Sequence, residues 1–274
     1  MRIVDVHAHL TMPEFAPDLP EVLAHAAAAG VEMMLCVGTD LRSSDQCVEL
    51  ARRFPGRIWA AAGIHPNDAG EAGAQDLVSL CELCKHAEVV AVGETGLDFH
   101  HAFTPRDLQT WAFREHIRLA RETGKPLVVH ARKSDDEVLA ILAEEAAAAS
   151  PEEASLRGVR HCFDASLQIA ARYVEQGFYI SFGGILTQIG YKKVKAAAAA
   201  LPAERLLVET DCPYQAPASC AGARNEPAFI VETVRALAVL RSETPESVAD
   251  VTTSNARSLF FTERAGGPST ASEA

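Results

Sequence analysis

The sequence has few aromatic residues, a deficit of cationic residues and no framework of paired cysteines. Phe, Trp and Tyr make up 6% of the 274 residues and alanine-rich runs are common, which favours helices packed on a sheet over an all-β sandwich. The chain has 25 Lys and Arg against 37 Asp and Glu, a net charge of −12, so it has no general attraction to nucleic acid or to an anionic membrane. A polyanionic substrate therefore needs a local cationic patch or bound metal.

The cysteines and the apolar runs indicate the compartment. Seven cysteines, an odd number, are scattered along the chain, which is typical of reduced thiols. The N-terminal stretch MRIVDVHAHL has no long apolar segment of the signal-peptide type, and no run approaches the ~18 apolar residues of a membrane span. We expect a cytoplasmic protein without a membrane partner. Since the sequence has no heptad repeat, we also expect a monomer without an obligate protein partner.

Short apolar segments alternate with helix-like segments along most of the chain. This alternation predicts an α/β fold, a single (β/α)8 TIM barrel over residues 1–261. A doubly wound open sheet is the alternative, but no G-x-G-x-x-G follows the first segment. The small, polar residues 262–274 predict a disordered tail. The expected strands are Ile3–His7, Glu32–Val37, Ile58–Gly63, Val89–Gly93, Leu127–His130, Val159–His161, Phe178–Ser181 and Leu206–Glu209.

The clearest helix is expected from Pro105 to about Thr123. Thr104 suits the N-cap, Pro105 suits the first helical position and Gly124 suits the C-terminal stop. His116 falls on the apolar face of this helix, so we interpret it as a packed histidine and not as a ligand.

Imidazoles and carboxylates follow several of the expected strands. Each one alone is weak evidence, because a single histidine at a strand end is usually just hydrogen-bonded. In a TIM barrel, however, the carboxyl ends of all strands meet at one face, and in His7-Ala8-His9 both rings point the same way. One catalytic zinc needs three protein ligands, so this larger set predicts two ions about 3.5–4 Å apart. The set comprises His7, His9, Glu94, His130, His161 and Asp211.

The motifs around these residues resemble those of the TatD family of metal-dependent deoxyribonucleases. They are DVHAHL, GIHP, VGETGLDF, KPLVVHARKSDDEVLAIL, HCF, ISFGG, LLVETDCPY and RNEP, in order from about Arg2 to about Phe261. The resemblance implies a TIM barrel with two divalent ions (Mg2+, Mn2+ or Zn2+) that activate water. It also implies phosphodiester hydrolysis with 3′→5′ exonuclease character on nucleic acid, with DNA preferred to RNA.

The resemblance also implies a role for each residue. His7 and His9 match the ligands of the first ion, His130 and His161 match those of the second, and Glu94 matches the bridging carboxylate. Asp211 matches a further ligand that accepts a proton, so Glu94 and Asp211 are the expected catalytic residues. The expected substrate-binding residues are His65, Arg132 and Arg224. For Arg132, a surface salt bridge to Asp135 or Asp136 is an equal alternative.

Some positions depart from the family pattern and leave other functions open. HCF continues with Asp164, His100 and His101 follow GLDF, and the uncharged run ASCAGA precedes RNEP. Each change removes positive charge or adds negative charge near the expected mouth. The alternative is the same barrel acting as a metal-dependent esterase, lactonase or amidohydrolase on a small molecule. A binding protein without turnover is a third hypothesis, disfavoured because six convergent polar residues would cost stability.

Overall fold

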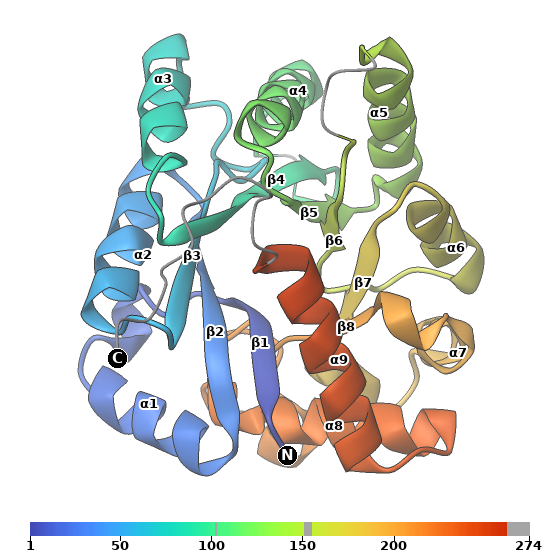
Figure 1. Cartoon of the computed structure of the whole chain (residues 1–274). Coiled ribbons are helices and arrows are strands. Elements are labelled where there is room, and N and C mark those ends of the chain that lie inside the picture. The colour runs from blue at the N-terminus through green and yellow to red at the C-terminus, as the bar shows by residue number, and fades with distance from the viewer. Residues whose placement is uncertain (102, 151–154, 262–274) are drawn as a thin grey trace, which may run out of the picture.

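Eight parallel strands form one sheet in the order of the sequence, and helices surround it (Figure 1). The computed structural model describes residues 1–101, 103–150 and 155–261. All eight expected strands are present, which confirms the (β/α)8 barrel against the open sheet; the expected disordered tail lies outside the described residues. The strands are β1 (Ile3–Ala8), β2 (Val31–Val37), β3 (Ile58–Ala62), β4 (Val89–Asp98), β5 (Leu127–Arg132), β6 (Gly158–Arg160), β7 (Tyr179–Phe182) and β8 (Leu206–Val208).

The helices follow the strands, and the last of them covers one end of the barrel. They are α1 (Leu19–Ala28), α2 (Leu41–Arg53), α3 (Ala74–Leu83), α4 (Arg106–Thr123), α5 (Asp135–Ala148), α6 (Leu167–Glu175), α7 (Lys192–Ala200), α8 (Ile230–Arg241) and α9 (Pro245–Phe260). Short 3-10 helices are η1 (Pro13–Phe15), η2 (Gly184–Thr187), η3 (Ala203–Arg205), η4 (Ala218–Cys220) and η5 (Pro227–Phe229). None of the described helices is long and apolar enough to cross a membrane.

The interior of the barrel is an apolar core that α9 covers at the amino-terminal ends of the strands. Val6 of β1 and Leu207 of β8 belong to one buried cluster with Leu259 and Phe260 of α9. In Figure 1 this helix lies in front of the strands. Because these side chains fill the barrel, the interior is a packed core and not a channel.

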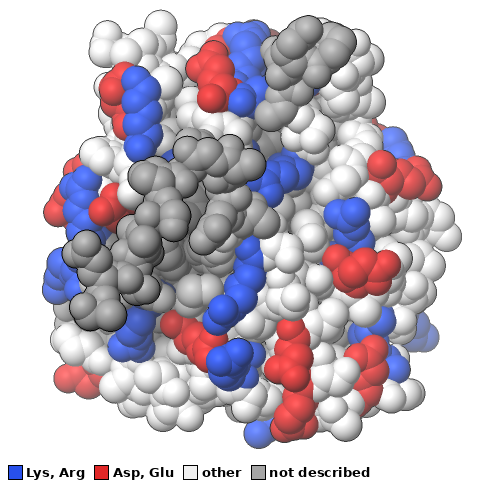
Figure 2. All heavy atoms as spheres, in the orientation of Figure 1, with Lys and Arg blue, Asp and Glu red and all other residues white. Residues whose placement is uncertain are grey.

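Charges of both signs are interspersed on the face that α9 covers. Figure 2 shows this face, and on the atoms not drawn in grey the Lys and Arg side chains lie beside Asp and Glu side chains. Glu32, for example, forms ion pairs with Arg2 at 3.2 Å and with Arg257 at 2.9 Å. Neither sign dominates this face, so it offers no cationic patch to a polyanion.

Helix α4 starts one residue later than its sequence predicts. Thr104 does not cap it, because the Thr104 hydroxyl donates to the carbonyl oxygen of Asn67 at 2.7 Å and accepts the N–H of Gly70 at 3.3 Å. The expected end is confirmed, since Gly124 is left-handed with φ 64°. The start was wrong because the threonine serves a neighbouring loop instead.

His116 of α4 is fully buried and packed, as its place on the apolar face predicts. Its Nε2 accepts the N–H of Ile64 at 2.9 Å, so Nδ1 carries the proton and donates to the carbonyl oxygen of Ala112 at 2.7 Å. Burial lowers the pKa of His116 to about 4. The neutral ring of His116 therefore links α4 to Ile64, which follows β3 and directly precedes His65.

Strand β4 continues to Asp98, five residues beyond its expected end at Gly93. The glycines of GETGLD look like a turn in the sequence, but here they permit close packing in a strand. Gly96 has φ 137°, and a Cβ at this position would lie 2.0 Å from the carbonyl oxygen of His130 on β5. Glycine thus lets β4 run against β5, which places Glu94 beside His130.

Candidate metal centre

The first and last strands of the sheet, β1 and β8, are joined near their carboxyl ends by backbone hydrogen bonds. These bonds also bring a cluster of side chains together. The N–H of Asp211 donates to the carbonyl oxygen of His7 at 2.9 Å, and the N–H of His9 donates to that of Cys212 at 2.8 Å. Asp211 is left-handed, with φ 55°, a conformation that aspartate tolerates better than most residues. These bonds bring residues from β1 and from the segment after β8 to one place.

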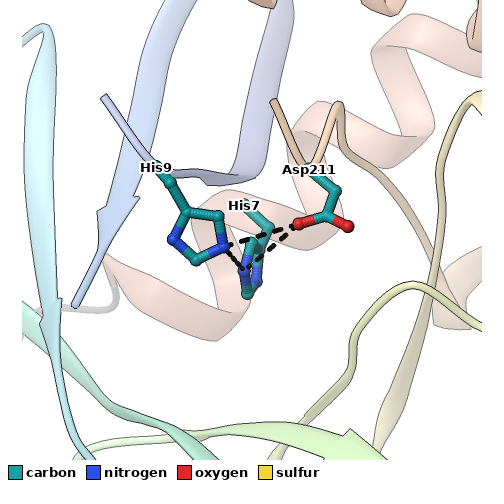
Figure 3. A group of neighbouring side chains, drawn as sticks. All are labelled: His7, His9 and Asp211. Carbon is teal, nitrogen blue, oxygen red and sulfur yellow. Dashed lines mark hydrogen bonds and ion pairs between the residues drawn. The ribbon is translucent and has the colours of Figure 1, made fainter. Parts of the chain in front are cut away.

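His7, His9 and Asp211 point toward one another in this cluster (Figure 3). The Nε2 atoms of the two rings are 3.2 Å apart. Asp211 Oδ1 lies 3.5 Å from His9 Nε2 and 3.8 Å from His7 Nε2. All three residues are buried. Two imidazole nitrogens and a carboxylate oxygen at these distances are suitable ligands for one divalent ion.

Glu94 lies between this cluster and a second pair of histidines. Its Oε2 is 3.3 Å from His7 Nε2. Its Oε1 is 2.8 Å from His161 Nε2 and 3.0 Å from His130 Nδ1. The two oxygens of one carboxylate therefore face two different groups of imidazoles, which is the placement of a bridging ligand.

The spacing of the donor atoms fits two cations. Four ligands at about 2.1 Å around a tetrahedral ion lie about 3.4 Å from one another. In the cluster, the corresponding distances run from 2.8 Å for His161 to Glu94 up to 3.8 Å for His7 to Asp211. The structure thus brings together all six residues that the sequence singled out as ligands.

A second layer of acceptors orients two of the four histidines, His9 and His130. In metal sites, a ligating histidine usually directs its other ring nitrogen to a carboxylate or carbonyl, which fixes the tautomer. Two rings follow this pattern, with one nitrogen toward Glu94 or Asp211 and the other toward an acceptor outside the cluster. The contacts are His9 Nδ1 to the Val37 carbonyl oxygen at 3.0 Å and His130 Nε2 to Asp98 Oδ2 at 3.3 Å. His161 Nδ1 lies 3.6 Å from Glu209 Oε1, beyond hydrogen-bond distance.

Asp98 and Glu209 are functional candidates that the sequence prediction left out of the site. Asp98 also accepts His101 Nδ1 at 2.8 Å. Burial alone would raise the pKa of Asp98, but its hydrogen bonds with His130 and His101 hold it far below its usual range. Glu209 is fully buried, and its Oε2 has no hydrogen-bond partner among the described residues. Asp98 ends the motif GETGLD, and Glu209 directly follows β8 in VETD; this position at a strand end was the available signal.

The electrostatics of the cluster favour positive charge at its centre. Burial lowers the pKa of His9 and His161, but Asp211 and Glu94 outweigh it and raise them to about 9 and about 10. Burial raises the pKa of Glu94, yet the surrounding imidazoles hold it well below its usual range. The carboxylates are therefore anionic at neutral pH, as cation ligands must be.

His65 approaches Glu94 but differs from the other histidines. Its Nε2 lies 3.5 Å from Glu94 Oε1, and the three side chains of His65, Glu94 and His130 are close enough to hold an ion. Its Nδ1, however, accepts the N–H of Asn67 at 3.1 Å. Burial lowers the pKa of His65 to about 3, so the neutral ring carries its one proton on Nε2. His65 is thus arranged as a donor, which suits the substrate-facing place predicted for it.

A cavity of about 780 Å³ opens above the cluster, and Arg132 lines it. The alternative of a salt bridge from Arg132 to Asp135 or Asp136 is not seen. Asp135 binds Arg160 at 2.9 Å, and Asp136 pairs with Arg172. The guanidinium of Arg132 makes no hydrogen bond or ion pair with the part of the chain that the structure describes.

The structure does not bring Arg224 to this cavity. Its guanidinium forms two hydrogen bonds with the carboxylate of Asp18, at 2.8 and 2.7 Å, and stacks over Phe15 at 4.7 Å. The geometry therefore gives no support to Arg224 as a substrate-binding residue. Asp164 pairs with Arg160 at 2.8 Å, but Arg160 also pairs with Asp135, so this group keeps a net negative charge.

A TIM barrel with imidazoles and carboxylates gathered at the carboxyl ends of its strands defines the class of metal-dependent barrel hydrolases. Residues 4–261 match the family described as TatD related DNase. The chain belongs to this family, and it is a metal-dependent hydrolase.

Two relatives and one crystal structure match this protein over nearly the whole chain. The chain is 39% identical to the metal-dependent hydrolase YabD of Bacillus subtilis, over 94% of this chain and 98% of YabD. It is 36% identical to the 3′-5′ ssDNA/RNA exonuclease TatD of Salmonella typhimurium, over 93% of this chain and 98% of that protein. The crystal structure of the TatD homologue YJJV from Escherichia coli superposes with a TM-score of 0.86 at 29% identity, covering 96% of this chain and 99% of YJJV.

Proposed function

We propose that this protein hydrolyses phosphodiester bonds of single-stranded DNA from the 3′ end. It does so as a cytoplasmic monomer whose single catalytic domain spans residues 1–261. The observation that carries this proposal is Glu94, which directs one oxygen to His7 and the other to His130 and His161. A pair of ions bridged by a carboxylate is suited to in-line displacement at phosphorus. The relationship to a Salmonella exonuclease that acts on single strands supports the substrate class.

We propose two divalent ions, each with its own histidine pair. His7, His9 and Asp211 would hold the first, His130 and His161 would hold the second, and Glu94 would serve both through its two oxygens. This mixture of imidazole and carboxylate suits Zn2+ or Mn2+, while Mg2+ prefers oxygen ligands. When bound, the ions supply Lewis acidity, which lowers the pKa of the attacking water and neutralises charge on the phosphate oxygens.

The side chains around the ions supply proton transfer and orientation. Burial favours the neutral form of Asp211, but its hydrogen bond with His9 keeps its pKa below the usual range. Asp211 is therefore a carboxylate that can take a proton from the attacking water. His65 Nε2–H is placed to donate to a phosphate oxygen. Arg132 lines the cavity without a carboxylate partner among the described residues, so its guanidinium is free for a phosphate.

Release of nucleotides from single-stranded DNA, with Mg2+, Mn2+ or Zn2+ added separately, tests this function. We expect cleavage that requires metal and is lost in Glu94→Ala and Asp211→Asn. Glu246→Ala and Asp250→Asn are matched controls, since both residues are exposed on α9. Turnover of simple esters without cleavage of DNA would favour the esterase alternative, and a folded protein that binds no metal by elemental analysis would overturn both.

A further inference from the structure

The aromatic residues on the surface are confined to the mouth of the cavity. Among the described residues, only three Phe, Tyr or Trp side chains are exposed: Phe103 at 75%, and Tyr191 and Tyr214 at 50% each. All three line the cavity above the candidate metal centre. Single exposed apolar side chains are common on protein surfaces. Their restriction to one opening, in a chain with 6% aromatic residues, indicates a ligand with flat apolar faces.

Phe103 belongs to a stacked pair that is anchored to the barrel. It lies between β4 and α4, and its ring stacks on that of His101 with centroids 5.5 Å apart and planes inclined by 23°. The ring of His101 is held in turn by Asp98 Oδ2 at 2.8 Å. Because Asp98 ends β4, this pair of rings has a fixed position on the rim.

Tyr214 is equally well fixed and lies beside the first ligand group. Its ring meets that of His9 edge-on, with centroids 6.1 Å apart and planes inclined by 70°. Its N–H donates to the carbonyl oxygen of Asp211 at 2.9 Å, and its own carbonyl accepts Asn225 Nδ2 at 2.6 Å. A flat group resting on Tyr214 is thus adjacent to the proposed reaction centre.

Tyr191 contributes the third ring, next to cationic side chains. It precedes α7 in a left-handed conformation with φ 45°. The exposed Lys192 and Lys193 follow it. Neither lysine forms an ion pair with any of the described residues. Arg132, at the end of β5, forms none with them either. Aromatic faces therefore line this opening together with Arg132, and Lys192 and Lys193 adjoin Tyr191 in the sequence.

Flat rings in combination with free cations match a single-stranded nucleic acid. Its unpaired bases stack on aromatic side chains whatever their sequence, and its phosphates attract Lys and Arg. A duplex, in contrast, hides the faces of its bases within its own stack. We infer that Phe103, Tyr191 and Tyr214 form a stacking site for unpaired bases. The substrate is then held as a strand of several nucleotides; this inference rests on the proposed phosphodiesterase function.

Paired substitutions in protein and strand test this site. The variants Phe103→Leu, Tyr191→Leu and Tyr214→Leu keep an apolar side chain but remove the ring. Each is compared on a ten-residue thymidine strand and on a strand of ten abasic residues, which has the same phosphates but no bases. The dissociation constant is measured by fluorescence anisotropy in EDTA, and KM and kcat are measured with metal added.

We expect each leucine variant to weaken binding of the thymidine strand by about 5-fold to about 100-fold, the usual range for loss of one stacked base. The preference for thymidine over abasic strand should fall toward one as the substitutions are combined. Tyr191→Phe and Tyr214→Phe should keep wild-type binding, because the ring remains. Ile189→Ala is the matched control, since Ile189 is 99% exposed two residues before Tyr191 but does not line the cavity.

The outcomes separate this inference from the proposed function. Leucine variants that retain the wild-type preference for the thymidine strand would overturn the stacking site, even if wild-type protein cleaves both strands. Wild-type protein that cleaves neither strand would overturn the phosphodiesterase function, while the binding measurements in EDTA would still report on stacking. Equal affinity of wild-type protein for both strands would also overturn the stacking site.

Discussion

The two ends of this barrel are built from the same strands but from opposite kinds of side chain. In β1, Val4 and Val6 belong to the apolar cluster that α9 covers, while His7 faces the candidate metal centre. After β8 the same change occurs between Leu207 and Asp211. One end removes apolar surface from water, which stabilises the fold. The other buries charged groups, which costs free energy unless they are paired. Stability and chemistry are thus separated along each strand.

Several residues at the end with the candidate metal centre have an unusual, left-handed backbone conformation. Lys133, Cys162 and Asp211 follow β5, β6 and β8, and all three are left-handed, with φ of 56°, 45° and 55°. Such conformations cost on the order of 1–3 kcal/mol per residue and concentrate at functional sites. Three left-handed residues thus follow strands at the end with the proposed chemistry; Ser242, which ends α8 ahead of α9, is left-handed as well, with φ 55°.

The largest effect is expected from Glu94→Gln at the open end of the barrel, which holds the cavity and the candidate metal centre. An amide is neutral and cannot serve both groups of imidazoles as the carboxylate does, so kcat on single-stranded DNA should fall on the order of 10³-fold. The free energy of unfolding in urea should also decrease at neutral pH, because the lowered pKa of Glu94 marks a stabilising charge and its loss leaves the buried imidazoles without an anionic partner. Glu246→Gln on α9 is the control. A kcat within tenfold of the wild-type value would contradict the central role proposed for Glu94.

At the end of the barrel that α9 covers, Leu259→Ala is expected to lower stability and to leave kcat unchanged. Leu259 is 2% exposed in the cluster beneath the barrel, and its truncation should lower the free energy of unfolding by about 2–5 kcal/mol. Measured at a temperature where the variant is folded, kcat should match wild type. A fall in kcat of tenfold or more would show that the two ends are coupled.

His116 predicts how stability depends on pH. Its pKa is about 4 in the folded protein and about 6.5 when unfolded, so the unfolded chain binds more protons between these values. Its contribution is present above pH 6.5 and decreases by at most about 3 kcal/mol as the pH falls to 4. Urea unfolding of wild type and His116→Gln across this range measures it. Equal slopes in the two proteins would assign the pH dependence to other groups.

The smallest effect is expected for Asp98→Asn, behind the open end. Asp98 orients His130 from outside the ligand cluster, so its loss should weaken metal affinity by about 10-fold to 100-fold and leave the metal count unchanged. Competition with a chelator measures the affinity, and Asp107→Asn, exposed on α4, is the matched control. An affinity equal to that of the control would mean that His130 needs no such support.

The sequence predicts the strands well because their signals are local, whereas several parts of the site depend on distant contacts. An apolar segment followed by a turn identifies β1 or β5 without any knowledge of its neighbours. The extension of β4 was missed because only the packing of Gly96 on His130 shows that GETGLD is a strand. Arg224 was placed in the site because nothing near it in the sequence indicates its partner, Asp18.

The candidate centre was predicted as six ligands, but its second layer was not. Strand-end position singles out His130 and His161 as candidate ligands, since all such ends meet at one face. It does not reveal that Asp98 contacts His130 from behind, or that Glu209 lies close enough to His7 and His161 to hold an ion with them. Those contacts depend on the direction of each ring nitrogen, which only the folded structure gives.

The backbone bonds that join Asp211 to His7 and His9 to Cys212 have a consequence for biosynthesis. The ribosome makes both histidines with the first strand of the barrel, but it adds Asp211 and Cys212 only after all eight strands have been made. A nascent chain therefore carries two of the three residues of the first ligand group during most of the synthesis of the barrel and lacks the third. Ion capture by that group becomes possible only late in synthesis, when most of the barrel already exists to hold it.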